Sequence, residues 1–191
     1  MNAYKGFNPD LTCTKGQGTY QYTPGETVRE KESKTRKSGF HYSEYPPECF
    51  AWYPIDGKNR YFLVDASGSI DEENSDVSTC TELTLVEELT VRQMALHTLV
   101  YMLNHPRREW KTKGRNLDIS EESAECMTAP GIAIARGKSP KARGCAGTII
   151  GLLKEAAGGE QIASAHVVGE RGIRPGKWYG IVNGEVKMLE T

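Results

Sequence analysis

Only one long stretch of this chain repeats its apolar residues at the step of an α-helix, between Thr90 and Asn104. The members of this stripe, spaced three or four residues apart, are Val91, Met94, Ala95, Leu99, Met102 and Leu103. Thr90 and Gln93 match a capping box at the start, and His105-Pro106 stops the pattern. The sequence therefore predicts one amphipathic helix, and strands with turns for most of the remainder.

The residues before this helix predict short strands separated by turns. Strands are expected at residues 3–7 and 60–66, and Pro24-Gly25 marks a turn between hairpin arms at 19–22 and 27–29. Pro46-Pro47 suits a first helical turn, so a short helix is expected there, ending at Pro54.

The residues after the helix are richer in Ala and Gly. Residues 131–144 hold two Ala-Arg-Gly triplets seven residues apart, which predicts a tightly coiled strand–turn–strand. Strand-like runs follow at 148–154, 161–168, 177–182 and 185–189, and Asn183-Gly184 favours a tight hairpin.

We therefore predict an α+β fold in three parts. Residues 1–105 form a mixed, strand-rich N-terminal domain that includes the amphipathic helix, and residues 106–120 form a basic linker. Residues 121–191 form a β-rich C-terminal domain, in which the Gly/Ala-rich coil precedes an antiparallel β-meander.

Charge and cysteine content restrict the function. The 24 Lys and Arg residues nearly balance the 25 Asp and Glu residues, which argues against a general phosphate-backbone binder and leaves room for a local basic patch. The five cysteines are scattered without metal-ligand spacing, so we expect buried thiols in a reducing compartment, no metal and no cofactor. No run approaches about 18 apolar residues, so we expect a cytoplasmic protein without membrane contact.

Two segments carry candidate binding residues, and each has a structural alternative. The aromatic segment supplies His41, Tyr42, Tyr45, Trp52 and Tyr53, which suit either a stacking cleft or hot spot, or the core of the first domain. The basic segment supplies Arg107, Arg108, Trp110 and Lys111, which suit either nucleic acid or an acidic partner, or a solvated linker.

The order of motifs in about the first 105 residues resembles a large family of phage and prophage proteins. The motifs are Lys5-Gly6-Phe7, residues 23–27 (TPGET), Gly39-Phe40-His41, Tyr45-Pro46 and residues 66–71 (ASGSID). The resemblance implies a mobile-element origin in a bacterial host and brings no activity with it.

Residues 131–144 resemble one repeat of the left-handed β-roll in the heads of trimeric bacterial adhesins. A coil that short cannot bury its own face, so it needs a cap, for which the C-terminal strands are available, or a partner chain. A self-associating structural module, with a homo-oligomer formed through the C-terminal part, is therefore one alternative for the function.

A third resemblance concerns enzymes. Residues 4–6 and 39–42, followed by a short aromatic helix, resemble the nicotinamide-pocket segments of mono-ADP-ribosyltransferases. It implies a role for Lys5 at an NAD site and for Glu82 or Glu88 as the catalytic glutamate, although the Ser-Thr-Ser strand and the Glu-x-Glu turn of that family are missing.

We find no catalytic constellation, so our leading expectation is a non-enzymatic phage accessory protein that binds a host component. The expected target is a defence protein, as in a CRISPR system, or a small nucleotide of an immune signalling pathway. The NAD-dependent transferase and the self-associating module remain as alternatives.

Overall fold

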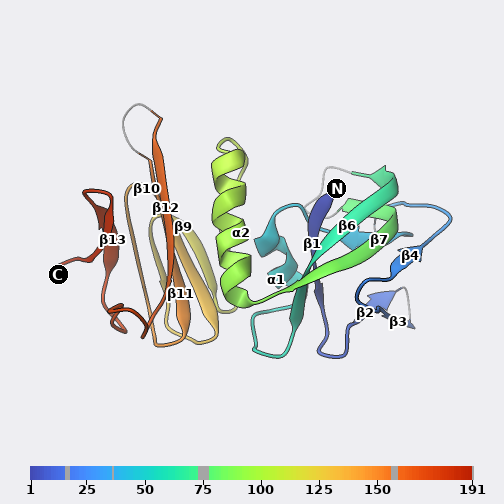
Figure 1. Cartoon of the computed structure of the whole chain (residues 1–191), viewed down its shortest axis with the longest axis horizontal. Helices are drawn as coiled ribbons and strands as arrows, with labels where there is room; N and C mark the ends of the chain where they lie inside the picture. The colour runs from blue at the N-terminus through green and yellow to red at the C-terminus, as the bar shows by residue number, and fades with distance from the viewer. Residues whose placement is uncertain (16–17, 36, 73–77, 156–158, 191) are drawn as a thin grey trace. The chain divides into compact units, whose positions relative to one another are not determined.

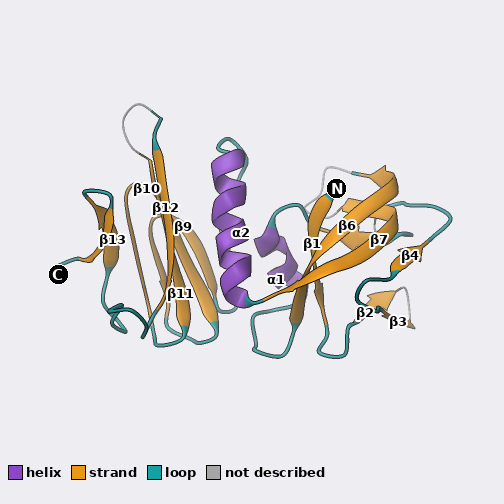
Figure 2. Cartoon of the chain, viewed as in Figure 1, coloured by secondary structure: helices purple, strands orange, loops and turns teal. Residues whose placement is uncertain are grey.

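The computed structural model describes residues 1–15, 18–35, 37–72, 78–155 and 159–190. The chain divides into two compact units, Met1–Thr90 (unit 1) and Val91–Thr191 (unit 2), which are described separately. Strands and loops make up most of both units (Figure 2). No described helix is both long and apolar enough to cross a membrane.

Unit 1 is an antiparallel sheet with a small hairpin and a short helical segment (Figure 1). Its elements are β1 (Asn2–Phe7), β2 (Thr12–Lys15), β3 (Gly18–Gln21), β4 (Thr27–Arg29), β5 (Phe40–Tyr42), η1 (Pro46–Glu48), α1 (Cys49–Trp52), β6 (Arg60–Asp71) and β7 (Ser78–Leu89). The sheet has the order β1-β6-β7-β4, with β5 also paired to β7, and β2 and β3 form a separate two-stranded sheet.

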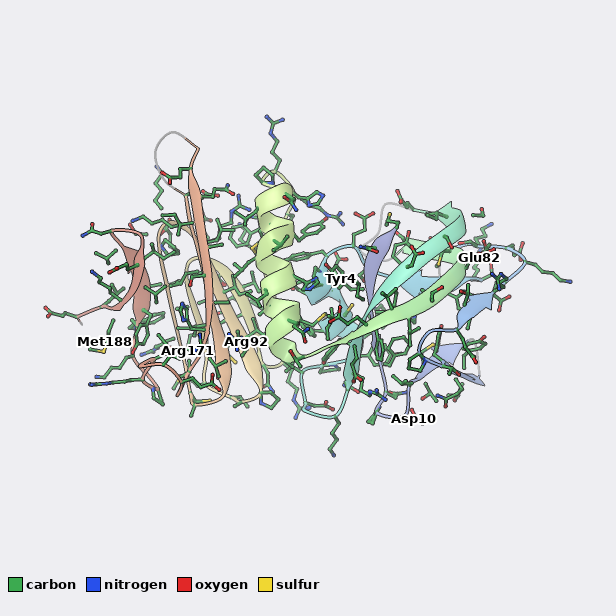
Figure 3. The ribbon with its side chains drawn as sticks, in the orientation of Figure 1. Tyr4, Asp10, Glu82, Arg92, Arg171 and Met188 are labelled. Carbon is green, nitrogen blue, oxygen red and sulfur yellow. The ribbon has the colours of Figure 1, made fainter. Side chains whose placement is uncertain are left out.

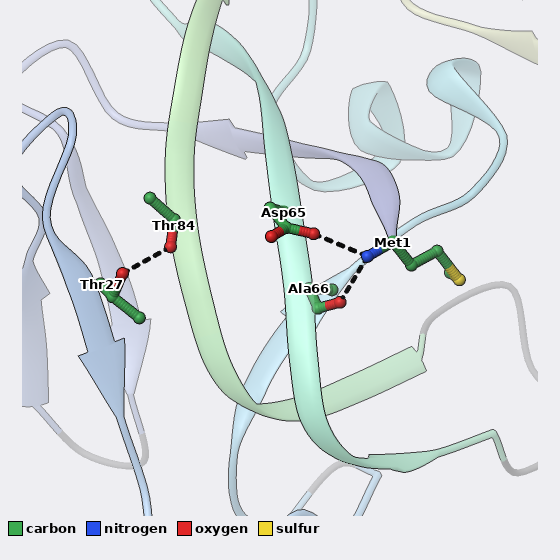
Figure 4. A network of polar contacts seen from close by, with 5 residues as sticks. All are labelled: Met1, Thr27, Asp65, Ala66 and Thr84. Carbon is green, nitrogen blue, oxygen red and sulfur yellow. Dashed lines mark hydrogen bonds and ion pairs between the residues drawn. The ribbon is translucent and has the colours of Figure 1, made fainter.

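Polar contacts fasten the outer strands of this sheet to its centre. The amino group of Met1 donates to Asp65 Oδ1 at 2.6 Å and to the carbonyl oxygen of Ala66 at 2.9 Å, which ties the start of β1 to β6 (Figure 4). On the other side, the hydroxyl oxygens of Thr27 and Thr84 are 2.7 Å apart and link β4 to β7. These contacts add to the backbone pairing of β1 with β6 and of β4 with β7.

Unit 2 combines one long helix with a mixed sheet. Its elements are α2 (Val91–Asn104), β8 (Thr112–Gly114), β9 (Leu117–Cys126), β10 (Gly131–Gly144), β11 (Thr148–Glu155), β12 (Gln161–Val167), β13 (Tyr179–Val182) and β14 (Glu185–Met188). The sheet has the order β12-β11-β10-β13-β14, and β9 lies between β8 and β10. The predicted apolar stripe buries Met94, Leu99 and Met102, and α2 packs against β10, β11 and β12.

The parallel pairing of β9, β10 and β11 requires that the strands bend. Leu117 lies opposite Ile132, which lies opposite Ile149. A straight strand of 10 residues would be about 33 Å long, and the four residues 127–130 reach back only about 14 Å. The register between β9 and β10 shifts between Arg136 and Lys141, and both carboxylate oxygens of Glu122 accept backbone N–H groups of the β10 bend. β10 is therefore one strand from Gly131 to Gly144 with an irregularity in its middle, where a strand–turn–strand was expected.

Several expected pairings differ in the structure. Residues 27–29 form β4, whose partner is β7 rather than the arm at 19–22. The C-terminal strands form two antiparallel pairs, β11 with β12 and β13 with β14, but β10 separates these pairs, so they are not a simple meander. Strand pairing joins residues distant in sequence, and local patterns do not specify the partner.

The boundaries of the parts also differ from the expected ones. The helix at 91–104 belongs to unit 2, because its apolar stripe covers the sheet of that unit. The segment 106–120, expected to be a linker, contains β8 and the start of β9, which pair with each other in antiparallel register. Its basic residues therefore belong to a folded part of unit 2.

Candidate functional site

Lys5 lies inside unit 1. Lys5 is 8% exposed, and its ammonium group donates a hydrogen bond to the carbonyl oxygen of His41 at 2.6 Å. The same nitrogen lies 5.6 Å from the ring centres of both Phe7 and Tyr22. Strand β1 places Lys5 there because its register with β6 puts the side chain opposite Phe62, which is also in the core. The amine is thus held by rings and one carbonyl group.

The surroundings of Lys5 disfavour charge. Burial lowers the pKa of the Lys5 amine, an effect that the nearby thiols of Cys13, Cys49 and Cys80 partly oppose. Burial also raises the pKa of Cys49 to about 12 and that of Cys80 to about 11, so both thiols stay protonated at neutral pH. A protonated, buried thiol is a poor nucleophile, and these groups behave as small apolar side chains.

The aromatic segment is mostly core, with one exception. Tyr42 and Tyr45 are 2% and 3% exposed, and His41 and Tyr53 are partly buried. Tyr53 packs over Gly6, where an added Cβ would come within 2.7 Å of Tyr53 Cδ2. Trp52, at the end of α1, is 70% exposed. Of this segment, Trp52 alone presents most of its ring to solvent.

The two glutamates that the transferase resemblance implicates are both paired with arginines. Glu88 accepts hydrogen bonds from Arg60 Nε at 2.7 Å and Nη2 at 2.6 Å, and these bonds lower its pKa. Glu82, labelled on β7 in Figure 3, lies 3.5 Å from the Nε of Arg29. Phe62 pairs with both Lys5 and Glu88, so the register places Lys5 and Glu88 on one face of the sheet.

The basic segment of unit 2 is folded onto the sheet. Its Trp110 ring lies 5.3 Å from the guanidinium carbon of Arg136 in β10, and the guanidinium of Arg108 lies 5.5 Å from the ring of Tyr101 in α2. Glu109 Oε1 accepts the backbone N–H groups of Trp110 and Lys111. These contacts order the segment while Arg107, Arg108 and Lys111 stay exposed.

Arg136 anchors this segment and was not among the residues singled out from the sequence. Its side chain is 5% exposed, and Nε donates to Glu155 Oε1 at 2.7 Å. Nη2 lies 2.6 Å from the same oxygen and donates to the carbonyl oxygen of Pro106 at 3.3 Å. The available signal was an arginine inside an otherwise small and apolar run, in the first Ala-Arg-Gly triplet.

The second triplet repeats this arrangement on the surface. Arg143 lies 4.6 Å from the ring centre of Trp178 and forms an ion pair with Glu125. Each triplet arginine thus has one tryptophan and one glutamate as partners. The difference is exposure, because 35% of the Arg143 side chain remains accessible.

The two units carry net charges of opposite sign, although the net charge of the whole chain is close to zero. Unit 1 has 9 Lys and Arg residues against 15 Asp and Glu residues, a net charge of −6. Unit 2 has 15 against 10, a net charge of +5. The near-balance of the whole chain therefore does not argue against a polyanionic partner for unit 2. No three His, Cys, Asp or Glu side chains in the described ranges form a group that could hold a metal ion.

Comparison with known proteins yields one match. A family model described as "Domain of unknown function (DUF7666)" matches residues 1–97, which is half of the chain. The match covers unit 1 and the start of α2, and the sheet of unit 2 lies outside it. No curated protein and no solved structure matches the chain.

Proposed function

The chain belongs to the DUF7666 family, and on that premise we propose that it acts by binding, with unit 2 as the part that contacts an acidic macromolecular partner. The observation that supports this proposal is that the basic segment has an ordered conformation. Arg107, Arg108 and Lys111 project from a backbone fixed by Trp110, Arg136 and the β8–β9 pairing. Fixed cations lose less conformational entropy on binding than those of a mobile linker do.

The host context of this proposal rests on the motif pattern that resembles phage and prophage proteins. On that basis the protein works in the cytoplasm of a bacterial host, and its partner is a component of a defence system, such as a CRISPR complex. An acidic protein partner suits the net charge of unit 2, since complementary charge accelerates encounter and selects among partners.

Charge reversal tests the role of the basic segment. The tagged chain is used to capture a partner from host lysate, and its affinity for the purified partner is then measured in low and high salt. The double variant Arg107→Glu/Lys111→Glu should weaken binding by about tenfold or more and flatten the salt dependence. The control Lys31→Glu/Lys34→Glu makes the same charge change at exposed positions of unit 1. Equal affinity of the two double variants would contradict the proposal.

The second candidate is NAD-dependent transfer, which the placement of Lys5 and Glu88 on one sheet face favours. Glu88→Gln should then abolish transfer of label from NAD to protein. Glu82→Gln should retain this transfer, because Glu82 lies at the strand position that pairs with Arg29. A wild-type protein that leaves labelled NAD unchanged removes this candidate.

A further inference from the structure

One charged nitrogen in unit 2 is buried without an acceptor. The Nε and Nη2 atoms of Arg136 point to Glu155 and Pro106, but Nη1 has no hydrogen-bond partner among the described residues. Buried donors are nearly always satisfied, and a guanidinium nitrogen is one of the strongest donors in a protein. An arginine that is 4% exposed and keeps two unused N–H bonds therefore calls for an acceptor from outside the chain.

The geometry around Nη1 specifies the chemistry of that acceptor. Glu155 occupies the Nε and Nη2 side of the planar guanidinium, so the free N–H groups belong to the opposite nitrogen. An oxygen atom that carries negative charge suits such a donor, because charge-assisted hydrogen bonds are the strong ones and arginine matches phosphate and carboxylate. A tetrahedral phosphate can also direct its other oxygens outward.

The charge of the neighbourhood allows an added anion. Glu155 already balances the charge of Arg136. The exposed cations Arg107 and Lys111 lie next in sequence to Pro106 and Trp110, the two residues of the segment that contact Arg136. The two glutamates near these cations already have partners. Glu109 accepts hydrogen bonds from backbone N–H groups, and Glu121 Oε2 lies 3.9 Å from Lys111 Nζ. The basic segment can therefore neutralise an anion bound to Nη1.

We propose that Nη1 of Arg136 is the inner donor of an oxyanion site that takes a phosphate group, either free or in a phosphate ester, with the Trp110 ring beside it. The basic segment contacts this guanidinium through the Trp110 ring, 5.3 Å from Cζ, and through the Pro106 carbonyl oxygen, which accepts from Nη2 at 3.3 Å, so neither polar contact of Arg136 uses Nη1. The site does not depend on the macromolecular partner proposed above.

Arg143 offers a matched control within the same chain. It has the same pair of partner types, Trp178 and Glu125, and sits in the same strand β10. Its side chain is 35% exposed, so water can satisfy the donors that Glu125 leaves free. Phosphate should therefore gain little at Arg143.

The test uses Trp110 as the reporter. In a Trp52→Phe/Trp178→Phe background, Trp110 is the only tryptophan left, and its emission is followed during titration with inorganic phosphate, methyl phosphate or chloride at constant ionic strength. We expect a saturable change with phosphate and none with chloride. Arg136→Lys, which keeps the charge but lacks Nη1, should weaken phosphate binding by about tenfold or more, while Arg143→Lys should leave it unchanged.

A second measurement remains informative if Arg136→Lys disturbs folding. In the unaltered chain, the Nε–H resonance of Arg136 in a nitrogen-15 NMR spectrum should shift with phosphate, and that of Arg143 should not. Tighter binding of methyl phosphate identifies an ester as the ligand, and tighter binding of inorganic phosphate identifies the free ion. Absence of a saturable response, an equal response to chloride, or equal shifts of both arginines would each overturn the proposal.

Discussion

The packing of Gly6 against Tyr53 permits a direct test of whether the aromatic segment of unit 1 is core. Gly6 lies in β1 with extended backbone, so alanine introduces no backbone strain there. An added Cβ would lie 2.7 to 2.9 Å from Cδ2, Cβ and Cγ of Tyr53, well inside normal contact distance. Because two of these atoms are at the base of the side chain, ring rotation alone cannot relieve the clash.

The expected cost follows from overpacking. One extra methyl group in a well-packed core costs about 1–3 kcal/mol, which for a unit of this size lowers the melting temperature by roughly 4–8 °C per kcal/mol. Gly6→Ala should therefore lower the free energy of unfolding of unit 1 by about 1–3 kcal/mol. Urea unfolding followed by Trp52 emission, in a Trp110→Phe/Trp178→Phe background, reports on this unit.

Two further variants make the reasoning refutable. Gly114→Ala, in β8 of unit 2, is the control for an added Cβ that meets no clash: it would meet only Leu117, at 3.8 Å or more, so the stability of unit 2 should change by less than about 0.5 kcal/mol. In a Tyr53→Ala background the clash is gone, and Gly6→Ala should cost close to nothing. An undiminished cost in that background, or no cost in the wild type, would show that Tyr53 does not pack on β1 as described.

Three further predictions concern titratable groups. Burial lowers the pKa of Lys5, so the folded protein loses the ammonium proton at a lower pH than the unfolded chain does. The stability of wild type relative to Lys5→Met, measured by urea unfolding, should therefore rise with pH up to about 10.5. Burial and the charges of Arg92 and Arg171, both labelled in Figure 3, lower the pKa of His166, so wild type should lose stability relative to His166→Gln as pH falls below 6.5; parallel pH profiles would contradict this. Cys145 is partly exposed and the other four cysteines are buried, so a thiol reagent should label one thiol before unfolding and five after it.

Elements defined by neighbouring residues were predicted correctly. The apolar stripe and the stop at His105-Pro106 predicted the helix that the structure places at Val91–Asn104. The Asn183-Gly184 turn has positive φ at both residues, 53° and 80°, and joins β13 to β14. Helix periodicity and turn geometry depend on a few residues in sequence, which is why the residues alone suffice for them.

The candidate sites could be predicted from the sequence only in part. The sequence left two interpretations for the aromatic segment, and the structure buries Tyr42 and Tyr45 while it exposes Trp52. It also left the basic segment open between linker and binding surface, and the structure attaches it to β10 through Arg136. Arg136 could not be predicted as a site residue, because its partners Glu155 and Pro106 are distant from it in sequence.

The sequence by itself determined a strand-rich α+β chain, the position of its main helix, its tight turns and the location of its basic residues. Only the tertiary structure decided that this helix covers the C-terminal sheet, that β10 pairs in parallel with both β9 and β11, and that the acidic and basic residues fall into units of net charge −6 and +5. The physical reason is that local propensity acts through adjacent residues, whereas strand partners, burial of a charge and the grouping of charges result from contacts between residues far apart in the chain.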